Sequence, residues 1–161
     1  MRMSRKFWII SVVVVVIVAA CVLILPFPKK ISMNVPAVRK DNGGNISATT
    51  IAWEGKYLDY LLKQDYMDGI VTVDADRKTA VDFRVDWGID KIRDGVMCTV
   101  GFYRSERDDE MRTWNIYFGS SLDWIAVYDS ALGSFVAPAS DEAEANSLVQ
   151  RIREAGFNLG W

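Results

Sequence analysis

The sequence predicts a mainly β fold, in which a single transmembrane helix precedes a small antiparallel sheet or sandwich with one C-terminal helix. Three observations lead to this prediction: an uncharged run of 19 residues near the N-terminus, several short segments in which apolar and polar residues alternate, and one amphipathic stretch near the C-terminus. Alternation with a period of two is typical of half-buried strands, whereas apolar residues at every third or fourth position indicate a helix. The chain of 161 residues is long enough for one domain and an appendage.

The uncharged run extends from Phe7 to Leu25 and is expected to cross a membrane. As a helix it would span about 28 Å, which is close to the thickness of the hydrocarbon core of a bilayer. Two prolines follow it and end the helix, and an aromatic pair at its start suits the membrane interface. We therefore expect residues 1–6 to form a short cytoplasmic tail and residues 7–25 to form a signal-anchor in the lipid bilayer of the cell membrane. The C-terminal domain is expected outside the cytoplasm.

A second interpretation of the same run concerns Cys21. The tetrapeptide VAAC that ends at this residue resembles the bacterial lipobox, which implies cleavage before Cys21 and attachment of lipid to its thiol. A polar, flexible tether normally follows a lipidated cysteine, whereas the apolar sequence VLILPFP follows here. The sequence therefore favours a retained anchor, with a lipoprotein anchored at Cys21 as the alternative.

Residues 26–45 are expected to form either a juxtamembrane tether or a first strand and turn, because ISMNV alternates and DNGGN is rich in turn residues. Residues 46–161 are expected to form an extracytoplasmic β-rich domain. In residues 80–88, AVDFRVDWG, apolar and charged residues alternate, which indicates a half-buried strand. The nearly apolar segment GVMCTVGFYR, residues 95–104, indicates a more central strand.

The C-terminal helix is predicted over residues 141–155. Alanine, leucine, valine and isoleucine recur there at helical spacing, so one face is expected to pack on the sheet. Ser140 is the predicted N-cap, and Gly156 follows the last turn as a natural stop.

The charge of the expected domain argues against nucleic acid as a partner. All 21 acidic residues but only 14 of the 19 basic ones lie after Lys30, which gives residues 31–161 a formal charge of −7. Such a domain is repelled by phosphate backbones. Histidine is absent, which removes the most frequent general base and metal ligand. Cys98 lies alone in a predicted strand and is expected to be a small buried residue.

No catalytic, cofactor-binding or metal-binding residue is assigned. The segment ISMNVP is similar to the nucleophile region of type I signal peptidases, but only Ser32 and Met33 match the S-M-x-P pattern and no lysine stands in the family's position. Asp74 and Asp76 form a D-x-D pair, yet basic residues follow them where a calcium loop needs ligands.

Trp53, Tyr57 and Tyr60 are the candidate residues for a ligand patch, because charged residues surround the two tyrosines. An exposed aromatic patch on a β-sheet would suit a carbohydrate. Trp87 and Trp114 share a face with aliphatic neighbours and are expected in the core.

In layout the chain resembles small single-pass exported proteins of bacteria. We expect a non-catalytic module that binds another protein of the bacterial cell envelope. The alternative is a module that binds the cell wall or another glycan through exposed aromatic side chains, and a minor alternative is a carboxylate-based envelope hydrolase. The sequence identifies neither the partner nor the ligand.

Overall fold

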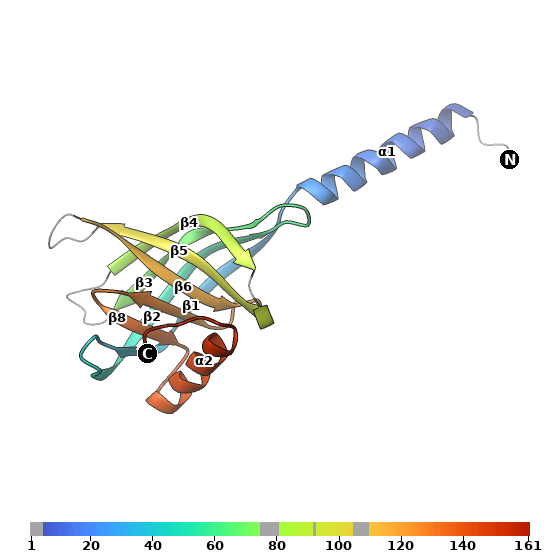
Figure 1. The fold of residues 1–161 in the computed structure, drawn as a ribbon. Helices are drawn as coiled ribbons and strands as arrows, with labels where there is room; N and C mark the ends of the chain where they lie inside the picture. Colours follow the sequence, from blue (N-terminus) through green and yellow to red (C-terminus); the bar gives the residue numbers. More distant parts are fainter. Residues whose placement is uncertain (1–4, 75–80, 92, 105–109) are drawn as a thin grey trace.

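The computed structural model describes residues 5–74, 81–91, 93–104 and 110–161, which form an eight-stranded antiparallel barrel with a helix at either end of the chain (Figure 1). In chain order the elements are α1 (Arg5–Ile24), β1 (Phe27–Lys40), β2 (Ile46–Asp59), β3 (Asp65–Asp74), β4 (Val81–Lys91), a 3-10 turn (Arg93–Gly95), β5 (Val96–Arg104), β6 (Met111–Gly119), β7 (Ile125–Asp129), β8 (Gly133–Ala137) and α2 (Glu142–Glu154). Each strand pairs with the next, and β8 pairs with β1 to close the barrel. The mainly β fold with an N-terminal apolar helix and a C-terminal helix is therefore confirmed.

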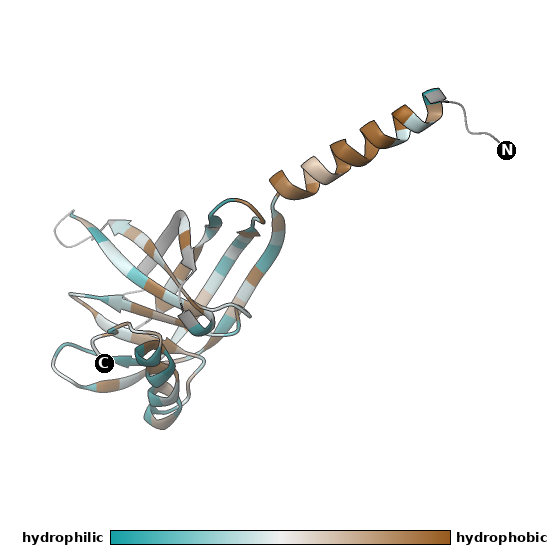
Figure 2. Cartoon of the chain, turned by 45° about the vertical axis from the view of Figure 1, so that its right-hand side comes forward, coloured by the Kyte–Doolittle hydropathy of each residue, from teal (hydrophilic) through white to brown (hydrophobic). Residues whose placement is uncertain are grey.

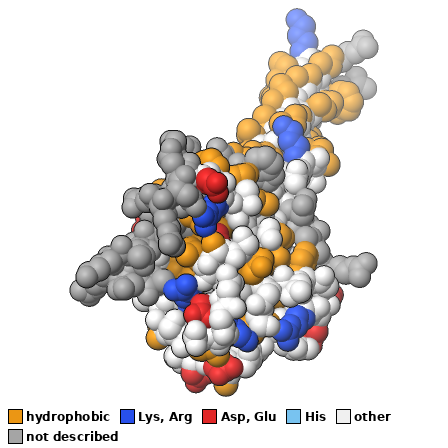
Figure 3. Space-filling model, turned by 60° about the vertical axis from the view of Figure 1, so that its left-hand side comes forward, with side chains coloured by type: hydrophobic (Ala, Val, Ile, Leu, Met, Phe, Trp, Pro, Cys, Tyr) orange, Lys and Arg blue, Asp and Glu red, His pale blue; other side chains and the backbone are white. Residues whose placement is uncertain are grey.

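Helix α1 projects away from the barrel and is apolar along almost its whole length (Figures 2 and 3). Its segment Lys6–Ile24 is long and apolar enough to cross a membrane, and none of it is buried against the barrel. Only Leu25 and Pro26 separate α1 from β1. Residues 26–45, expected to be a tether or a first strand and turn, thus contain the first strand and its turn.

The turn between β1 and β2 is built around Asp41. One carboxylate oxygen of Asp41 accepts hydrogen bonds from the backbone N–H groups of Gly43, at 2.9 Å, and Asn45, at 2.8 Å. The Asn45 side chain donates to the other oxygen at 2.9 Å. These bonds, led by that from the Asn45 side chain, lower the pKa of Asp41. The turn residues of DNGGN therefore bring β2 back along β1.

The main core lies inside the barrel. Because side chains alternate along a strand, every second residue of each strand points inward, as Ile51, Trp53 and Tyr57 do in β2. Large aromatic rings fill the interior: Trp53 meets Phe118 edge-on with ring centroids 5.4 Å apart. An eight-stranded barrel has an interior just wide enough for such side chains.

Two buried aspartates face this interior at opposite ends of the barrel. Asp65, at the start of β3, accepts hydrogen bonds from the Tyr57 hydroxyl and from the backbone N–H of Tyr60. Asp129, at the end of β7, accepts from the Tyr103 hydroxyl and from the indole N–H of Trp114. Its other oxygen accepts two backbone N–H groups of the following turn, at 2.6 and 2.7 Å. Each carboxylate thus accepts hydrogen bonds from donors that would otherwise be buried without a partner at its end of the barrel.

A second core lies outside the barrel, where α2 covers the outer faces of β1 and β8. Ala145, Val149 and Ile152 of α2 are buried there against the barrel. The N-cap is Asp141, whose side chain accepts from the Glu144 backbone N–H at 2.9 Å. The prediction of Ser140 as the N-cap is therefore wrong by one residue.

Ser140 instead donates from its backbone N–H and its hydroxyl to the Glu144 carboxylate, at 2.8 Å each. This contact and the Asp141 cap form a reciprocal capping arrangement at the start of α2.

Some expectations concern residues whose placement or side chains lie outside the description. They include the alternating face of Val81, Phe83, Val85 and Trp87, and the D-x-D pair of Asp74 and Asp76. Cys98 is half-buried rather than fully buried, because it points outward from β5 toward the second core.

Buried tyrosines predict a loss of stability in alkali. Burial raises the pKa of Tyr57 and Tyr103, with further contributions from Asp65 and Asp129 respectively, and it raises the pKa of Tyr117 to about 12. Below about pH 9 these phenols are neutral in the folded and in the unfolded chain, so the free energy of unfolding has its full value there. Above about pH 10 the unfolded chain releases protons that the folded chain keeps, and each group lowers the free energy of unfolding by roughly 1 kcal/mol per pH unit until its folded pKa is reached.

Urea unfolding in detergent, followed by tryptophan fluorescence between pH 8 and 12, measures this effect. Tyr117→Phe should flatten the decline above pH 10, whereas Tyr60→Phe, a change at a partly exposed site, should not. An identical decline in the wild type and in Tyr117→Phe would contradict the assignment.

Candidate functional site

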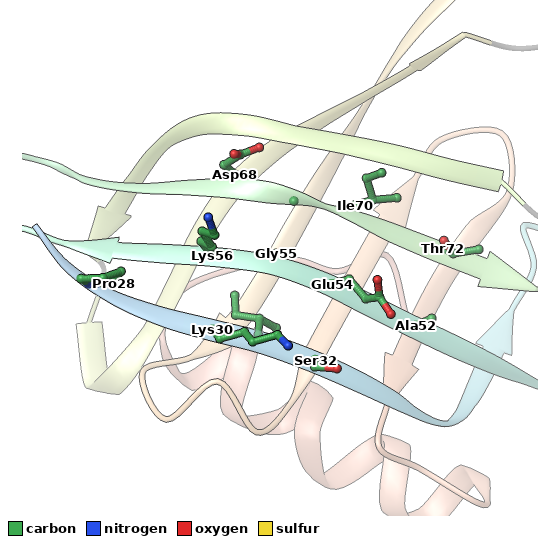
Figure 4. A pocket seen from close by; sticks show the side chains of 12 residues that line it. Pro28, Lys30, Ser32, Ala52, Glu54, Gly55, Lys56, Asp68, Ile70 and Thr72 are labelled. Atoms are coloured by element: carbon green, nitrogen blue, oxygen red, sulfur yellow. The ribbon is translucent and has the colours of Figure 1, made fainter.

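An open groove lies on the outer face of β2, β3 and the first part of β1 (Figure 4). Helix α2 packs on another part of the barrel, against β8 and the later residues of β1 (Figure 1). The groove encloses about 990 Å³. Three strands supply its side chains, and it begins at Pro28, close to the end of α1. It is the candidate site because side chains from three strands line it and it is open to solvent.

The register of the three strands aligns the side chains of the groove in rows. Lys30 pairs with Lys56 across β1 and β2, and Lys56 pairs in turn with Asp68 of β3. In the next row Ser32 pairs with Glu54, and Glu54 pairs with Ile70. Because these residues occupy alternate positions, all of them point away from the barrel interior.

Two facing glycines shape the barrel wall beneath the groove. Gly55 of β2 and Gly69 of β3 are paired directly, at positions that face inward. A Cβ added to Gly55 would lie 2.4 Å from the backbone oxygen of Asp68 and 2.7 Å from the Cα of Gly69. Only glycine permits this close approach of the two backbones.

The charged side chains of the groove are available to a ligand. Within the described residues, Lys30, Lys56 and Asp68 make no ion pair or side-chain hydrogen bond with the rest of the chain. Ile70 lies among them with 49% of its surface exposed. A groove with free charges of both signs around an apolar side chain suits a polypeptide segment, which carries such groups in alternation.

Ser32, the residue considered as a nucleophile, lies in this groove and is exposed. Lys30 and Lys56 share its face of the sheet, but both are exposed to water. Activation of a serine by a lysine depends on removing the lysine from water. Neither lysine is therefore the desolvated base that Ser–Lys chemistry requires.

The aromatic residues predicted to form a ligand patch do not lie together on the surface. Trp53 is 0% and Tyr57 is 4% exposed, since both point into the barrel. Tyr60 alone is partly exposed, in the β2–β3 turn, where the Lys63 ammonium lies 5.9 Å from its ring centroid. The expected patch is therefore reduced to one of its three members.

Trp53 has one unusual property inside the barrel. Its buried indole N–H has no hydrogen-bond partner within the described part of the chain. An unsatisfied donor costs stability, so packing of the large ring against Phe118 must outweigh that loss.

The remaining candidate residues lie apart from the groove. Cys21 is exposed in the last turns of α1. Among the described residues, no three histidine, cysteine or acidic side chains are grouped so that they could hold a metal ion.

Sequence reasoning did not identify the groove. Its signal was the occurrence of outward-facing charges of both signs on three strands, together with a glycine in the middle of β2 and of β3.

Comparison of the chain with protein-family models, with curated proteins and with solved structures found no match.

The glycine pair predicts a sharp sensitivity to one added methyl group. Gly55→Ala places a Cβ against backbone atoms of β3 that have no room to move, so the free energy of unfolding should fall by about 2–4 kcal/mol. Urea unfolding of the full-length protein in detergent measures the change.

Gly88→Ala is the matched control. The three atoms nearest to the added Cβ there all belong to the end of the Gln64 side chain, which is exposed, rather than to backbone. We expect a loss below about 1 kcal/mol for this variant. Equal losses at both glycines would contradict the role given to the Gly55–Gly69 pair.

Proposed function

We propose that this protein is a membrane-tethered, non-catalytic binding module, whose barrel lies outside the cytoplasm and holds a segment of another envelope protein in the groove of β1, β2 and β3. Helix α1 is the tether. The observation that carries the proposal is the groove itself, a hollow of about 990 Å³ whose charged side chains have no partners within the described chain.

The chemistry of the groove favours a polypeptide over a glycan. Glycan sites depend on exposed aromatic rings that stack on sugar faces, and Trp53 and Tyr57 are buried inside the barrel. Lys56 and Asp68 instead offer a cation and an anion on neighbouring strands, around the apolar side chain of Ile70. A partner segment with an apolar anchor and flanking charges would complement this pattern.

The position of the groove supports a partner that is itself at the membrane. Its first lining residue, Pro28, comes four residues after the end of α1. A retained α1 would therefore hold the groove close to the bilayer surface, where the segments of other membrane proteins emerge.

Site-specific photo-crosslinking tests the proposed function. A photoreactive amino acid replaces Ile70 in the full-length protein, and cells are irradiated before the protein is recovered in detergent. We expect one predominant crosslinked protein. The double substitution Glu54→Lys with Lys56→Glu keeps the net charge but inverts the pattern in the groove, and it should reduce that product roughly tenfold if one charged contact of about 1.4 kcal/mol is lost.

The control carries the photoreactive residue at Glu142, which is exposed on α2 away from the groove. Capture of the same protein with equal yield from Glu142, or a yield from Ile70 that the charge inversion leaves unchanged, would contradict the groove as the binding site.

A further inference from the structure

The turn between β2 and β3 presents two exposed leucines at its tip. Leu61 is 57% and Leu62 is 70% exposed. The tip comprises residues 60–64 and has the sequence YLLKQ. Neither leucine belongs to the two hydrophobic cores. Adjacent exposed leucines in a barrel whose other large apolar side chains are mostly buried indicate a surface that is covered by something else.

Strand register places this tip at the end of the barrel that carries α1. Phe27, the first residue of β1, pairs with Asp59, the last residue of β2. The tip continues β2 past that pair, so it extends toward the level of Leu25, where α1 ends. Figures 1 and 2 both show the turn beside the end of the helix. Phe27, which is 48% exposed, adds a third apolar side chain at the same end.

The base of the turn is held firmly. Asp65 is buried and accepts hydrogen bonds from the Tyr57 hydroxyl and, at 2.9 Å, from the Tyr60 backbone N–H. These bonds join the last residues of β2 and the first residue of β3 at the base of the tip.

The charges near the tip differ from those of the domain as a whole. Asp59 is paired with Lys29 at 3.3 Å, so neither contributes a free charge. Lys63 lies over the ring of Tyr60 within the tip, and Lys29 and Lys30 lie at the same end of the barrel on β1. The three lysines outnumber the two carboxylates of this end, Asp59 and the buried Asp65, so its formal charge is +1. Leucine, tyrosine and lysine side chains together are typical of surfaces that lie in the headgroup region of a bilayer.

We propose that the tip, residues 60–64, is a second membrane contact, in which Leu61 and Leu62 enter the headgroup region of the same bilayer that α1 crosses and Lys63 faces anionic lipid. This contact rests on the proposed tethering by α1. With two attachment points, the barrel has a fixed orientation on the membrane, and the groove of β1, β2 and β3 faces a defined direction.

Three labelled positions test the contact in the full-length protein, reconstituted in vesicles of phosphatidylcholine and phosphatidylglycerol. Cys21→Ala and Cys98→Ala remove the native thiols. An environment-sensitive fluorophore is then attached after Leu62→Cys, Met111→Cys or Val15→Cys. Met111 is the matched control, since it is apolar and 67% exposed but lies at the start of β6, at the opposite end of the barrel. Val15 lies within α1 and reports on the tether itself.

The label at Leu62→Cys should shift to shorter wavelength and be quenched most by lipids that carry a spin label near the headgroup, whereas the label at Met111→Cys should remain in water. If Val15→Cys is quenched by deep spin labels but Leu62→Cys behaves like Met111→Cys, the tip contact is overturned and the tether stands. If Val15→Cys also reports water, both the tether and the contact are overturned.

Discussion

The short connection between α1 and β1 is the constraint on which the rest of the structure depends. The backbone N–H of Leu25 still donates to the carbonyl of Cys21 at 2.9 Å, so the helical pattern continues to this residue. Pro26 then has no N–H to donate, and β1 begins at Phe27. Two residues between helix and strand keep the start of β1 close to the end of α1. The position of the groove near α1 follows from this short connection.

The outer surface of the barrel has a covered side and an open side. On one side α2 buries a second core against β8 and the later residues of β1, and the capping contacts of Ser140 and Asp141 with Glu144 fix where that helix starts. On the other side the first part of β1, together with β2 and β3, lines the open groove, and the outward charges there face solvent. The interior is occupied by aromatic rings, with Asp65 and Asp129 satisfying buried hydroxyl and indole groups at its two ends. Since side chains fill the interior and α2 covers one side, the open groove is the surface on which we expect a partner to bind.

Local patterns were sufficient to predict the elements but not how they meet. The uncharged run and the amphipathic C-terminal stretch each specify a helix, and both helices occur as expected. DNGGN forms a turn, which is one of the two alternatives that the sequence leaves open for residues 26–45. The alternation of Ile51, Trp53 and Tyr57 also places Tyr57 on the buried face, a signal outweighed in the prediction by the charged residues around it. The Gly55–Gly69 pair depends on the register between two strands, which periodicity within either strand does not specify. The rows of side chains in the groove depend on register between strands as well, so the pattern within single strands does not predict the groove.

We propose that α1 remains joined to the barrel and that Cys21 is not a site of cleavage. Mass measurement of the intact protein, extracted from membranes in detergent, is the test of this proposal. Cleavage at Cys21 would leave only the last turn of α1 before β1, without the flexible tether that a lipid-anchored domain normally has. We expect a mass that includes the residues before Cys21, with that thiol unmodified. A chain that begins at Cys21 and carries added lipid would contradict it.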